Sequence, residues 1–376
     1  MSVALASKAN AQASIDARYM ALALTLGRRG LGRTWPNPAV GAVIVKDGMI
    51  VGRGWTQPGG RPHAEIEALR RAGAAARGAT LYVTLEPCSH YGKSPPCADA
   101  VIVAGVARVV SALEDPNPEV AGAGHARLRA AGIAIDVGLG AEQARRDHAG
   151  HIRCMRDGRP HVFLKLAASA DGKAGAAGRK PVAITGERAR ERVHLLRAHS
   201  DAIMIGIGTA LADDPILTCR LPGMAGYSPV RVVLDGTLRL PTNSRLVCSA
   251  REVALWIVTA PQAPTGAKEA LEAAGATVLT VPRVDGRLDL AAVLHLLAER
   301  GISRLMVEAG PILAAALLEA DLVDEVALFR SDKVVGPDGI NALEGMPLTA
   351  LSRSPRLASV RSEAVGEDRC EVFERR

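Results

Sequence analysis

Short apolar runs alternate with segments of helical period along the first part of the chain. Lys46-Asp47-Gly48 separates two of the runs and predicts a hairpin turn. The predicted strands are Ala39–Val45, Met49–Gly52, Ala79–Leu85, Arg108–Ala112 and Ile133–Val137. The predicted helices are Ile15–Leu26, Glu65–Ala72, Ala98–Ala104 and Gly124–Ala131. Such alternation favours a sheet covered by helices.

The second part of the chain repeats this alternation. Its predicted strands are Val162–Leu166, Ala202–Gly206, Val230–Leu234, Val253–Val258, Thr277–Val281, Arg304–Val307 and Glu325–Leu328. Its predicted helices are Arg188–His199, Lys268–Ala274, Leu290–Glu299 and Ile312–Glu319. The polar stretch Ala144–Pro160 has no strand period, and we place a domain boundary near its end. We therefore expect a loose tail at 1–14 and two α/β domains at 15–158 and 159–376.

Composition narrows the class of protein. An apolar content of 48% supports two full-sized cores, and no apolar run reaches the about 20 residues of a membrane helix. Six cysteines in 376 residues do not form a disulfide framework, so we expect a cytoplasmic protein. Most of the net charge of +7 precedes residue 159, but without a block of basic residues. The charge therefore gives little support to nucleic-acid binding.

One imidazole and two thiols in the first part have the pattern of a zinc site. His63 opens a predicted helix, Cys88 follows a predicted strand, and Cys97 opens the next helix. These three ligands suit tetrahedral zinc with one open position, where the pKa of a water molecule falls towards about 7. Glu65, in the same helical turn as His63, is placed to carry a proton. The alternative is two structural thiols and a surface histidine.

The run Thr84–Cys97, with eight residues between its cysteines, closely resembles the deaminase domain of the bifunctional riboflavin-biosynthesis deaminase–reductases. The run Pro36–Val45 shares the resemblance. The resemblance implies a cytidine-deaminase-like fold, zinc on His63, Cys88 and Cys97, and proton transfer by Glu65. Asn37 fits a polar contact to the pyrimidine base, or a turn residue before Pro38.

The first part departs from that family at one place. Members often carry a histidine where this chain has Trp55-Thr56, which puts substrate contacts there in question but not the metal ligands. His90 and Lys93 lie in the long segment between the cysteines. They either face a phosphate of the ligand or belong to a solvated loop.

The second part resembles the reductase domain of the same family, which has a dihydrofolate-reductase-like fold and uses NADPH. The resemblance rests on Lys165–Lys173, Gly206–Thr209, Leu211–Thr218 and Glu308–Pro311. It implies cofactor contacts at Ala167, Ala183, Thr209, Asp213, Gly310, Pro311, Ile312, Leu313, Ala314, Ala315 and Ala316. It implies substrate contacts at Pro181, Arg197, Leu217, Arg220 and Glu308, with Arg197 and Arg220 as clamps on the phosphate. The alternatives are a solvated face for each arginine and a turn cap for Asp213.

The second part departs from the family at Pro181-Val182-Ala183. Many members have a serine and a tryptophan in this stretch, and this chain has neither the hydroxyl nor the indole. We expect a working reductase with weakened cofactor or substrate affinity.

The resemblance implies two consecutive reactions in riboflavin synthesis. The first domain would deaminate 2,5-diamino-6-(5-phosphoribosylamino)pyrimidin-4-one, and the second would reduce the ribosyl group with NADPH. The expected partner is this small phosphorylated pyrimidine, with no nucleic acid and no membrane, and a homo-oligomer is left open. A polynucleotide-editing deaminase and a non-catalytic zinc scaffold are the competing hypotheses. The eight-residue spacing opposes the first, and Glu65 beside an open metal position opposes the second.

Overall fold

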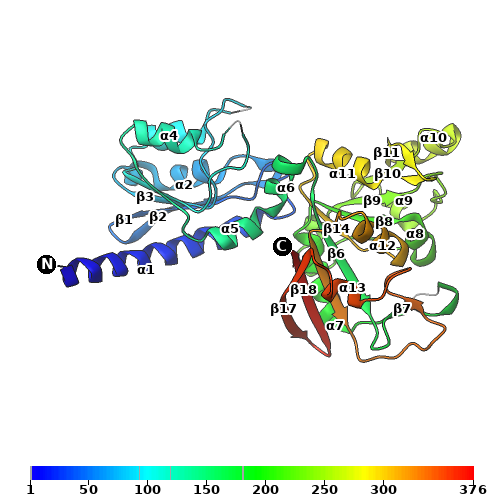
Figure 1. Ribbon diagram of the computed structural model, residues 1–376. Coiled ribbons are helices and arrows are strands. Elements are labelled where there is room, and N and C mark those ends of the chain that lie inside the picture. The colour runs from blue at the N-terminus through cyan, green and yellow to red at the C-terminus, as the bar shows by residue number, and fades with distance from the viewer. Residues whose placement is uncertain (1, 93, 119, 180–181) are drawn as a thin grey trace. The chain divides into compact units, whose positions relative to one another are not determined.

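The computed structural model describes residues 2–92, 94–118, 120–179 and 182–376. The chain divides into two compact units, Met1–Gly158 and Arg159–Arg376 (Figure 1). The first unit is built on a five-stranded sheet and the second on a nine-stranded sheet, as the alternating pattern predicts for α/β domains. Among the described residues, no helix combines the length and the apolar character that crossing a bilayer requires.

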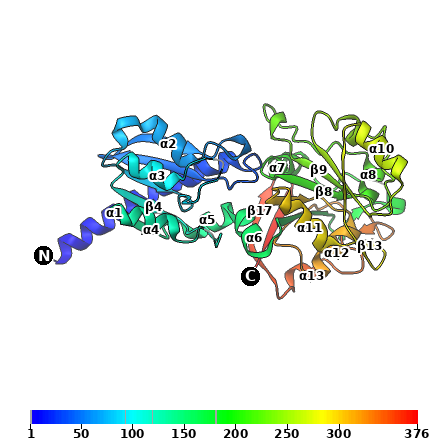
Figure 2. The same cartoon turned by 90° about the horizontal axis from the view of Figure 1, so that it is seen from above.

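The N-terminal segment is helical. Helix α1 spans Ser2–Gly27, so the prediction of a loose tail at 1–14 is wrong. Alanine has the highest helix propensity, and Ser2–Ser14 is rich in alanine and contains no glycine or proline to interrupt the helix. Figures 1 and 2 show the N-terminal part of α1 extending past the sheet of the first unit. Further along the helix, Met20, Ala23 and Leu24 are buried in the core.

The sheet of the first unit has the strand order β2-β1-β3-β4-β5. Strand β1 is antiparallel to β2 and β3, whereas β3, β4 and β5 are parallel. The strands are β1 (Gly41–Lys46), β2 (Met49–Trp55), β3 (Thr80–Val83), β4 (Arg108–Ser111) and β5 (Ala134–Val137). The other helices of the unit are α2 (Ala64–Ala72), α3 (Cys97–Val103), α4 (Ala123–Ala130), α5 (Ala141–Asp147) and α6 (Ala149–Asp157).

Two strand glycines allow helices to pack closely on opposite faces of this sheet. A Cβ atom on Gly41 would lie 1.9 Å from the carbonyl oxygen of Ala23 in α1. A Cβ atom on Gly54 would lie 2.3 Å from the carbonyl oxygen of Ala64 in α2. Gly54 pairs with the neighbour of Gly41, so the two glycines point to opposite faces. Only glycine permits such a close approach of backbone to backbone.

Gly54→Ala is expected to destabilise the first unit by about 1–3 kcal/mol, because α2 would have to shift away from the sheet. Since Ala64 lies between His63 and Glu65, the shift would also weaken zinc binding. Thermal unfolding and zinc content would measure both effects. Gly266→Ala is the control, because nothing lies within 4 Å of its added Cβ. Equal behaviour of the two variants would show that α2 does not depend on the contact.

The sheet of the second unit has the order β11-β10-β9-β8-β14-β6-β15-β18-β17. It is parallel from β11 to β15, and β18 and β17 add antiparallel strands at one edge. Its strands are β6 (His161–Ala168), β8 (Ala202–Gly206), β9 (Val230–Leu234), β10 (Leu255–Thr259), β11 (Thr277–Thr280), β14 (Arg304–Val307), β15 (Glu325–Arg330), β17 (Leu357–Val365) and β18 (Asp368–Arg375).

Two short antiparallel pairs accompany this sheet. They are β7 (Lys173–Gly175) with β16 (Ile340–Asn341), and β12 (Arg283–Val284) with β13 (Arg287–Leu288). The helices are α7 (Glu187–Ala198), α8 (Ile207–Asp213), α9 (Arg245–Cys248), α10 (Thr265–Ala273), α11 (Leu290–Glu299), α12 (Pro311–Glu319) and α13 (Thr349–Ser352). The carboxyl ends of the parallel strands lie along one edge of the sheet, which is where open α/β sheets bind ligands.

Candidate active sites in the two units

The predicted zinc ligands come together in the first unit. Nδ1 of His63 lies 3.7 Å from Sγ of Cys88 and 3.3 Å from Sγ of Cys97. All three potential ligand atoms lie within 4.8 Å of one another. With Zn–S bonds of about 2.3 Å and a Zn–N bond of about 2.0 Å, a tetrahedral ion would separate nitrogen and sulfur by about 3.5 Å. The donor set and its spacing therefore fit zinc.

Local structure explains how the three ligands converge. His63 is the N-terminal cap residue of α2, and Cys97 is the first residue of α3. Cys88 lies in the loop after β3, where its sulfur accepts a hydrogen bond from the backbone N–H of Cys97 at 3.3 Å. The carbonyl oxygen of Cys88 also accepts the N–H of Ala98. The starts of α2 and α3 and the loop after β3 thus bring the three ligand side chains together.

Electrostatics favours a thiolate at Cys88. The hydrogen bond from the thiol of Cys97 holds the pKa of Cys88 well below its usual range, and His63 lowers it further. Contact with Cys88 in turn raises the pKa of His63. A thiolate is the form that binds metal, so this site is prepared for a cation.

Glu65 points into the same site. Its side chain is only 4% exposed, and its carboxyl group is hydrogen-bonded to the thiol of Cys97. Burial raises the pKa of Glu65 to about 7. A carboxyl group with a pKa near neutrality both accepts and donates protons efficiently at physiological pH. Glu67, in the next turn position, instead pairs with Arg70 and Arg71 away from the ligands.

Glu86 holds the loop that carries Cys88, and the sequence analysis missed it. Its fully buried carboxylate accepts the backbone N–H groups of Asp115, Gly122 and His125, each at 3.0 Å. Glu86 also forms, with Glu114 and His125, a second group spaced closely enough for a metal. Because both of its oxygens already accept hydrogen bonds, we interpret Glu86 as a structural anchor for the Cys88 loop.

Of the other residues singled out in the first unit, two form hydrogen bonds to the backbone and one is exposed. The side-chain amide of Asn37 donates to the carbonyl oxygen of Gly60 at 2.8 Å, on the loop leading to His63. The hydroxyl of Thr56 is buried and accepts the N–H of Val40, so it supports the backbone there. His90 is exposed, and Lys93 lies outside the described residues.

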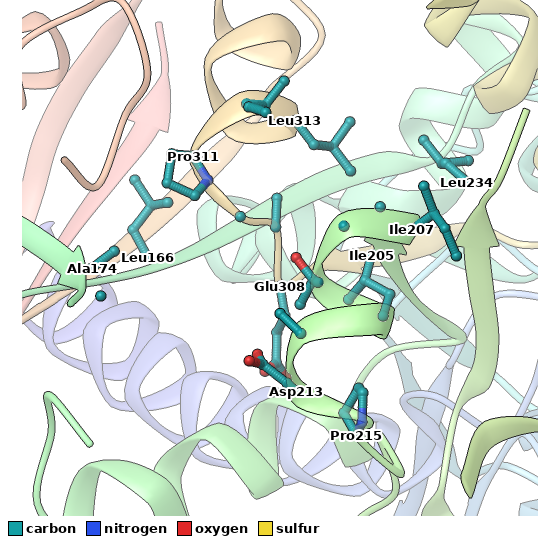
Figure 3. A pocket seen from close by; sticks show the side chains of 18 of the residues that line it. Leu166, Ala174, Ile205, Ile207, Asp213, Pro215, Leu234, Glu308, Pro311 and Leu313 are labelled. Carbon is teal, nitrogen blue, oxygen red and sulfur yellow. The ribbon is translucent and has the colours of Figure 1, made fainter. Parts of the chain in front are cut away.

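A cavity of about 890 Å³ opens in the second unit at the carboxyl ends of β6, β8, β9 and β14 (Figure 3). In Figure 3 the side chains of Leu313, Ile207 and Leu234 lie around the cavity, as does the carboxylate of Glu308. The predicted residues that line it are Ala167, Ala183, Thr209, Asp213, Gly310, Pro311, Ile312, Leu313, Ala316, Arg197, Leu217 and Glu308. Most of the residues that the sequence analysis named as cofactor or substrate contacts in the second unit thus line this cavity.

Three predicted contacts do not line the cavity. Ala314 and Ala315 are buried on the opposite side of α12, because consecutive helical residues cannot all face one ligand. Arg220 is exposed, and its guanidinium lies 3.5 Å from the ring of His194. Direct ligand contact at these three residues stays a prediction, which the lining of the cavity does not support. Pro181 lies outside the described residues.

Arg197 is engaged by protein groups rather than free to clamp a phosphate. Its Nε and Nη2 donate to the two carboxylate oxygens of Glu308 at 2.5 and 2.9 Å, and its Nη1 donates to the carbonyl oxygen of Thr218. Burial tends to raise the pKa of Glu308, but the charges of Arg197 and Lys165 lower it overall. Arg197 therefore fixes an ionised Glu308 at the cavity wall.

The sequence analysis missed several residues that line the cavity. Lys165 is half-buried beside Glu308, and burial lowers the pKa of its ammonium group. Ile340 and Ala342 reach the cavity from a distant segment, in which Lys333 donates to the carbonyl oxygen of Ala183. Arg239, Arg283 and Arg287 line it as well. Lys165 begins the sequence motif Lys165–Lys173, whereas the other residues come together only through the fold.

Comparison with protein families covers both units. Residues 13–113 match the cytidine and deoxycytidylate deaminase zinc-binding region. Residues 160–370 match the RibD C-terminal domain. The predicted fold class, a cytidine-deaminase-like zinc domain followed by a reductase domain, is confirmed by these matches.

Similar proteins match almost end to end. The riboflavin biosynthesis protein RibD of Escherichia coli (strain K12) is 44% identical over 368 residues, covering 94% of this chain and 98% of its own length. That of Aquifex aeolicus is 38% identical, covering 96% and 99%. The solved structure of RibD from Acinetobacter baumannii has a TM-score of 0.85 at 34% identity, covering 97% and 99%. A deaminase–reductase from Thermotoga maritima has a TM-score of 0.83 at 33% identity, covering 97% and 100%.

Proposed function

Because this chain belongs to the family of bifunctional riboflavin-biosynthesis deaminase–reductases, we propose that His63, Cys88, Cys97 and Glu65 carry the deamination and that the Glu308 cavity carries the reduction. The chain is a bifunctional enzyme of riboflavin synthesis, a deaminase in its first unit and a reductase in its second. The observation that carries the proposal is the convergence of one imidazole and two thiols beside a buried carboxyl group.

The substrate of the first reaction is 2,5-diamino-6-(5-phosphoribosylamino)pyrimidin-4-one. His63, Cys88 and Cys97 hold the zinc ion, which when bound lowers the pKa of a water molecule towards about 7. Glu65 accepts the proton of the attacking water and delivers it to a ring nitrogen and then to the departing ammonia. The pKa of about 7 suits Glu65 to both transfers. Asn37, fixed by Gly60, presents its side-chain carbonyl to the base.

The second reaction reduces the ribosyl group of the deaminated product to ribityl. NADPH, when bound, supplies the hydride. The carboxylate of Glu308 and the ammonium of Lys165 lie side by side at the cavity wall, so they accept from and donate to the hydroxyl groups of the sugar. Ala167, Thr209 and the start of α12 form the surface on which the cofactor lies.

The departure at Pro181-Val182-Ala183 leaves this cavity open to a ligand. Val182, Ala183 and Ile184 line it, and the bond from Lys333 to the carbonyl oxygen of Ala183 holds the segment in place. The small Ala183 side chain offers little area for stacking against the cofactor. This supports weaker cofactor binding by a reductase that still works.

The substrate is a small phosphorylated pyrimidine, and neither nucleic acid nor a membrane enters the proposed reactions. The metal site needs reduced thiols, and the cysteines of the described residues form no disulfide, which suits the reducing conditions of the cytoplasm.

The proposal is tested by giving the purified, zinc-loaded protein the diaminopyrimidine with and without NADPH. We expect ammonia release in both cases and NADPH consumption only after deamination. Ammonia release without any NADPH consumption would leave the first unit active and contradict the role of the cavity. Absence of ammonia release would contradict the role of the zinc site.

Arg197→Met is expected to destabilise the second unit by about 3 kcal/mol, because it leaves the carboxylate of Glu308 buried beside Lys165 without its bidentate partner. Reduction should weaken equally for the phosphorylated substrate and its dephosphorylated analogue. Thermal unfolding and the KM of both compounds would measure this. Arg192→Met, on the same helix with a half-exposed ion pair, is the control. A loss confined to the phosphorylated substrate would restore the phosphate clamp.

A further inference from the structure

A short polar segment of the first unit lies outside both regions that match known families. Residues 114–159 follow the matched deaminase region and precede the matched reductase domain. They contain helices α5 and α6, and residues 147–151, where the two helices meet, contribute an aspartate and two histidines (the α5–α6 junction). His148 is 2% exposed, and the side chain of His151 is 12% exposed. Polar side chains in such positions are normally hydrogen-bonded, so their partners show what the junction holds in place.

His148 is paired with the end of strand β3. Its Nε2 lies 3.1 Å from the hydroxyl oxygen of Thr84, the residue that directly follows β3. The same hydroxyl oxygen accepts the backbone N–H of Gly41, and the N–H of Thr84 donates to the carbonyl oxygen of Gly41. Thr84 is 1% exposed, so water does not replace these contacts. His148 therefore fixes the start of the loop that carries Cys88, four residues further along the chain.

His151 is paired with the loop after strand β4. Its Nε2 lies 2.9 Å from Oδ1 of Asp115, which also accepts the backbone N–H of Asn117 at 2.9 Å. Burial tends to raise the pKa of Asp115, but its hydrogen bond with His151 lowers the pKa overall, which favours the carboxylate. The backbone N–H of Asp115 donates to the carboxylate of Glu86 at 3.0 Å. A continuous chain of contacts thus runs from His151 through Asp115 to Glu86, two residues before Cys88.

The third polar residue of the α5–α6 junction has a different partner. The carboxylate of Asp147 accepts Nε of Arg28 at 3.0 and 3.1 Å. Arg28 directly follows α1, so this ion pair joins the junction to the end of a helix rather than to a loop of the zinc site. The junction therefore offers a contact that contributes to its packing alone, beside two contacts that reach the loops around Cys88.

From these contacts we infer that His148 and His151 are positioning residues of the deaminase, which hold the Cys88 loop at the spacing that zinc requires. The inference rests on the proposed deaminase function and adds to it a segment outside the matched deaminase region. Strands β3 and β4 have only four residues each, so the loops that follow them need support from elsewhere. Partners outside the first coordination shell commonly change metal affinity by about 10–100-fold, because they fix the direction of the ligands.

The test is the zinc affinity of the full-length protein, measured by competition with a chromophoric chelator. His151→Leu and His148→Leu are each expected to weaken zinc binding by about tenfold, the lower end of the range for partners that do not touch the metal. His151→Gln should restore most of the affinity, because its amide N–H takes the place of Nε2 beside Asp115. Arg28→Met is the matched control and should bind zinc as the wild type does, since it removes only the contact to Asp147.

Two further measurements separate positioning from general stability. Thermal unfolding of the zinc-free protein reports the packing of the junction, whereas the rise of the unfolding midpoint on adding zinc reports metal binding. Only the histidine variants should lose part of this rise. In the background of Asp115→Ala, His151→Leu should cost little further zinc affinity, because residues that act through one contact are not additive. NADPH consumption with supplied deaminated intermediate should be unchanged in every variant.

Three outcomes would overturn the inference. Wild-type zinc affinity in both leucine variants would show that the histidines only fill space. An equal loss of affinity in Arg28→Met would assign the effect to packing of the junction. Additive losses from His151→Leu and Asp115→Ala would show that His151 does not act through Asp115. A wild type that binds zinc without releasing ammonia would contradict the proposed deaminase function alone, whereas a wild type that binds no zinc would overturn both.

Discussion

Glu65→Gln is expected to keep its zinc and to lose deamination by at least about 10²–10⁴-fold, which is the usual contribution of one general acid–base group. The amide is nearly isosteric with the carboxyl group, so the buried site should retain its shape. It cannot accept the proton of the attacking water, and in the proposed mechanism Glu65 acts in two successive proton transfers. The reductase, which lies in the other unit, should be unaffected.

Glu67→Gln is the matched control for this variant. Glu67 lies on the same helix and is also buried, but it pairs with Arg70 and Arg71. Zinc content and ammonia release would be measured for both variants, together with reduction of supplied deaminated intermediate. Ammonia release by Glu65→Gln at a rate close to that of Glu67→Gln would contradict the assigned proton transfer.

Cys97→Ala is expected to weaken zinc binding by more than about 100-fold and to abolish deamination. Partners outside the first coordination shell already contribute about 10–100-fold, and a direct ligand contributes more. The change leaves His63 and Cys88 with no third ligand from the described triad. It also removes the hydrogen bond that holds down the pKa of Cys88, so the remaining thiol is less often a thiolate.

Cys154→Ala, in helix α6 of the same unit, controls for the loss of a thiol as such. Metal analysis after dialysis against a weak chelator would compare the two variants. NADPH consumption with supplied deaminated intermediate should remain normal in both. Full zinc occupancy of Cys97→Ala would remove this cysteine from the metal site.

The sequence predicted the cluster of His63, Cys88 and Cys97 because its members lie in short local patterns. His63 and Glu65 share one helical turn, and Cys97 opens a helix directly after two prolines. A helix start fixes the direction of its first side chains, so residue type and position together specify the chemistry. The alternation of apolar and helical segments likewise predicted two α/β domains, and both are present.

A continuous stretch of helical sequence cannot contact one ligand at every residue, because successive side chains point in different directions. The motif Gly310–Ala316 resembles a continuous cofactor wall, but in α12 the buried Ala314 and Ala315 face away from it. The prediction of a loose tail at 1–14 has a different cause. An Ala/Ser-rich segment without a long hydrophobic stretch suggests a loose tail, but its alanines favour the helix α1.

Only the tertiary structure decided which charges meet. Arg197 and Glu308 are 111 residues apart in the chain. The sequence predicts that Arg197 binds the phosphate of the substrate, but in the structure its bidentate ion pair supports the carboxylate of Glu308. Arg239 and Arg283 reach the cavity from the turn after β9 and from the distant β12–β13 hairpin, and Glu86 anchors the Cys88 loop through backbone groups. Local sequence fixes the direction of a side chain within its own element, but its partners depend on strand order and loop packing, which no local pattern specifies.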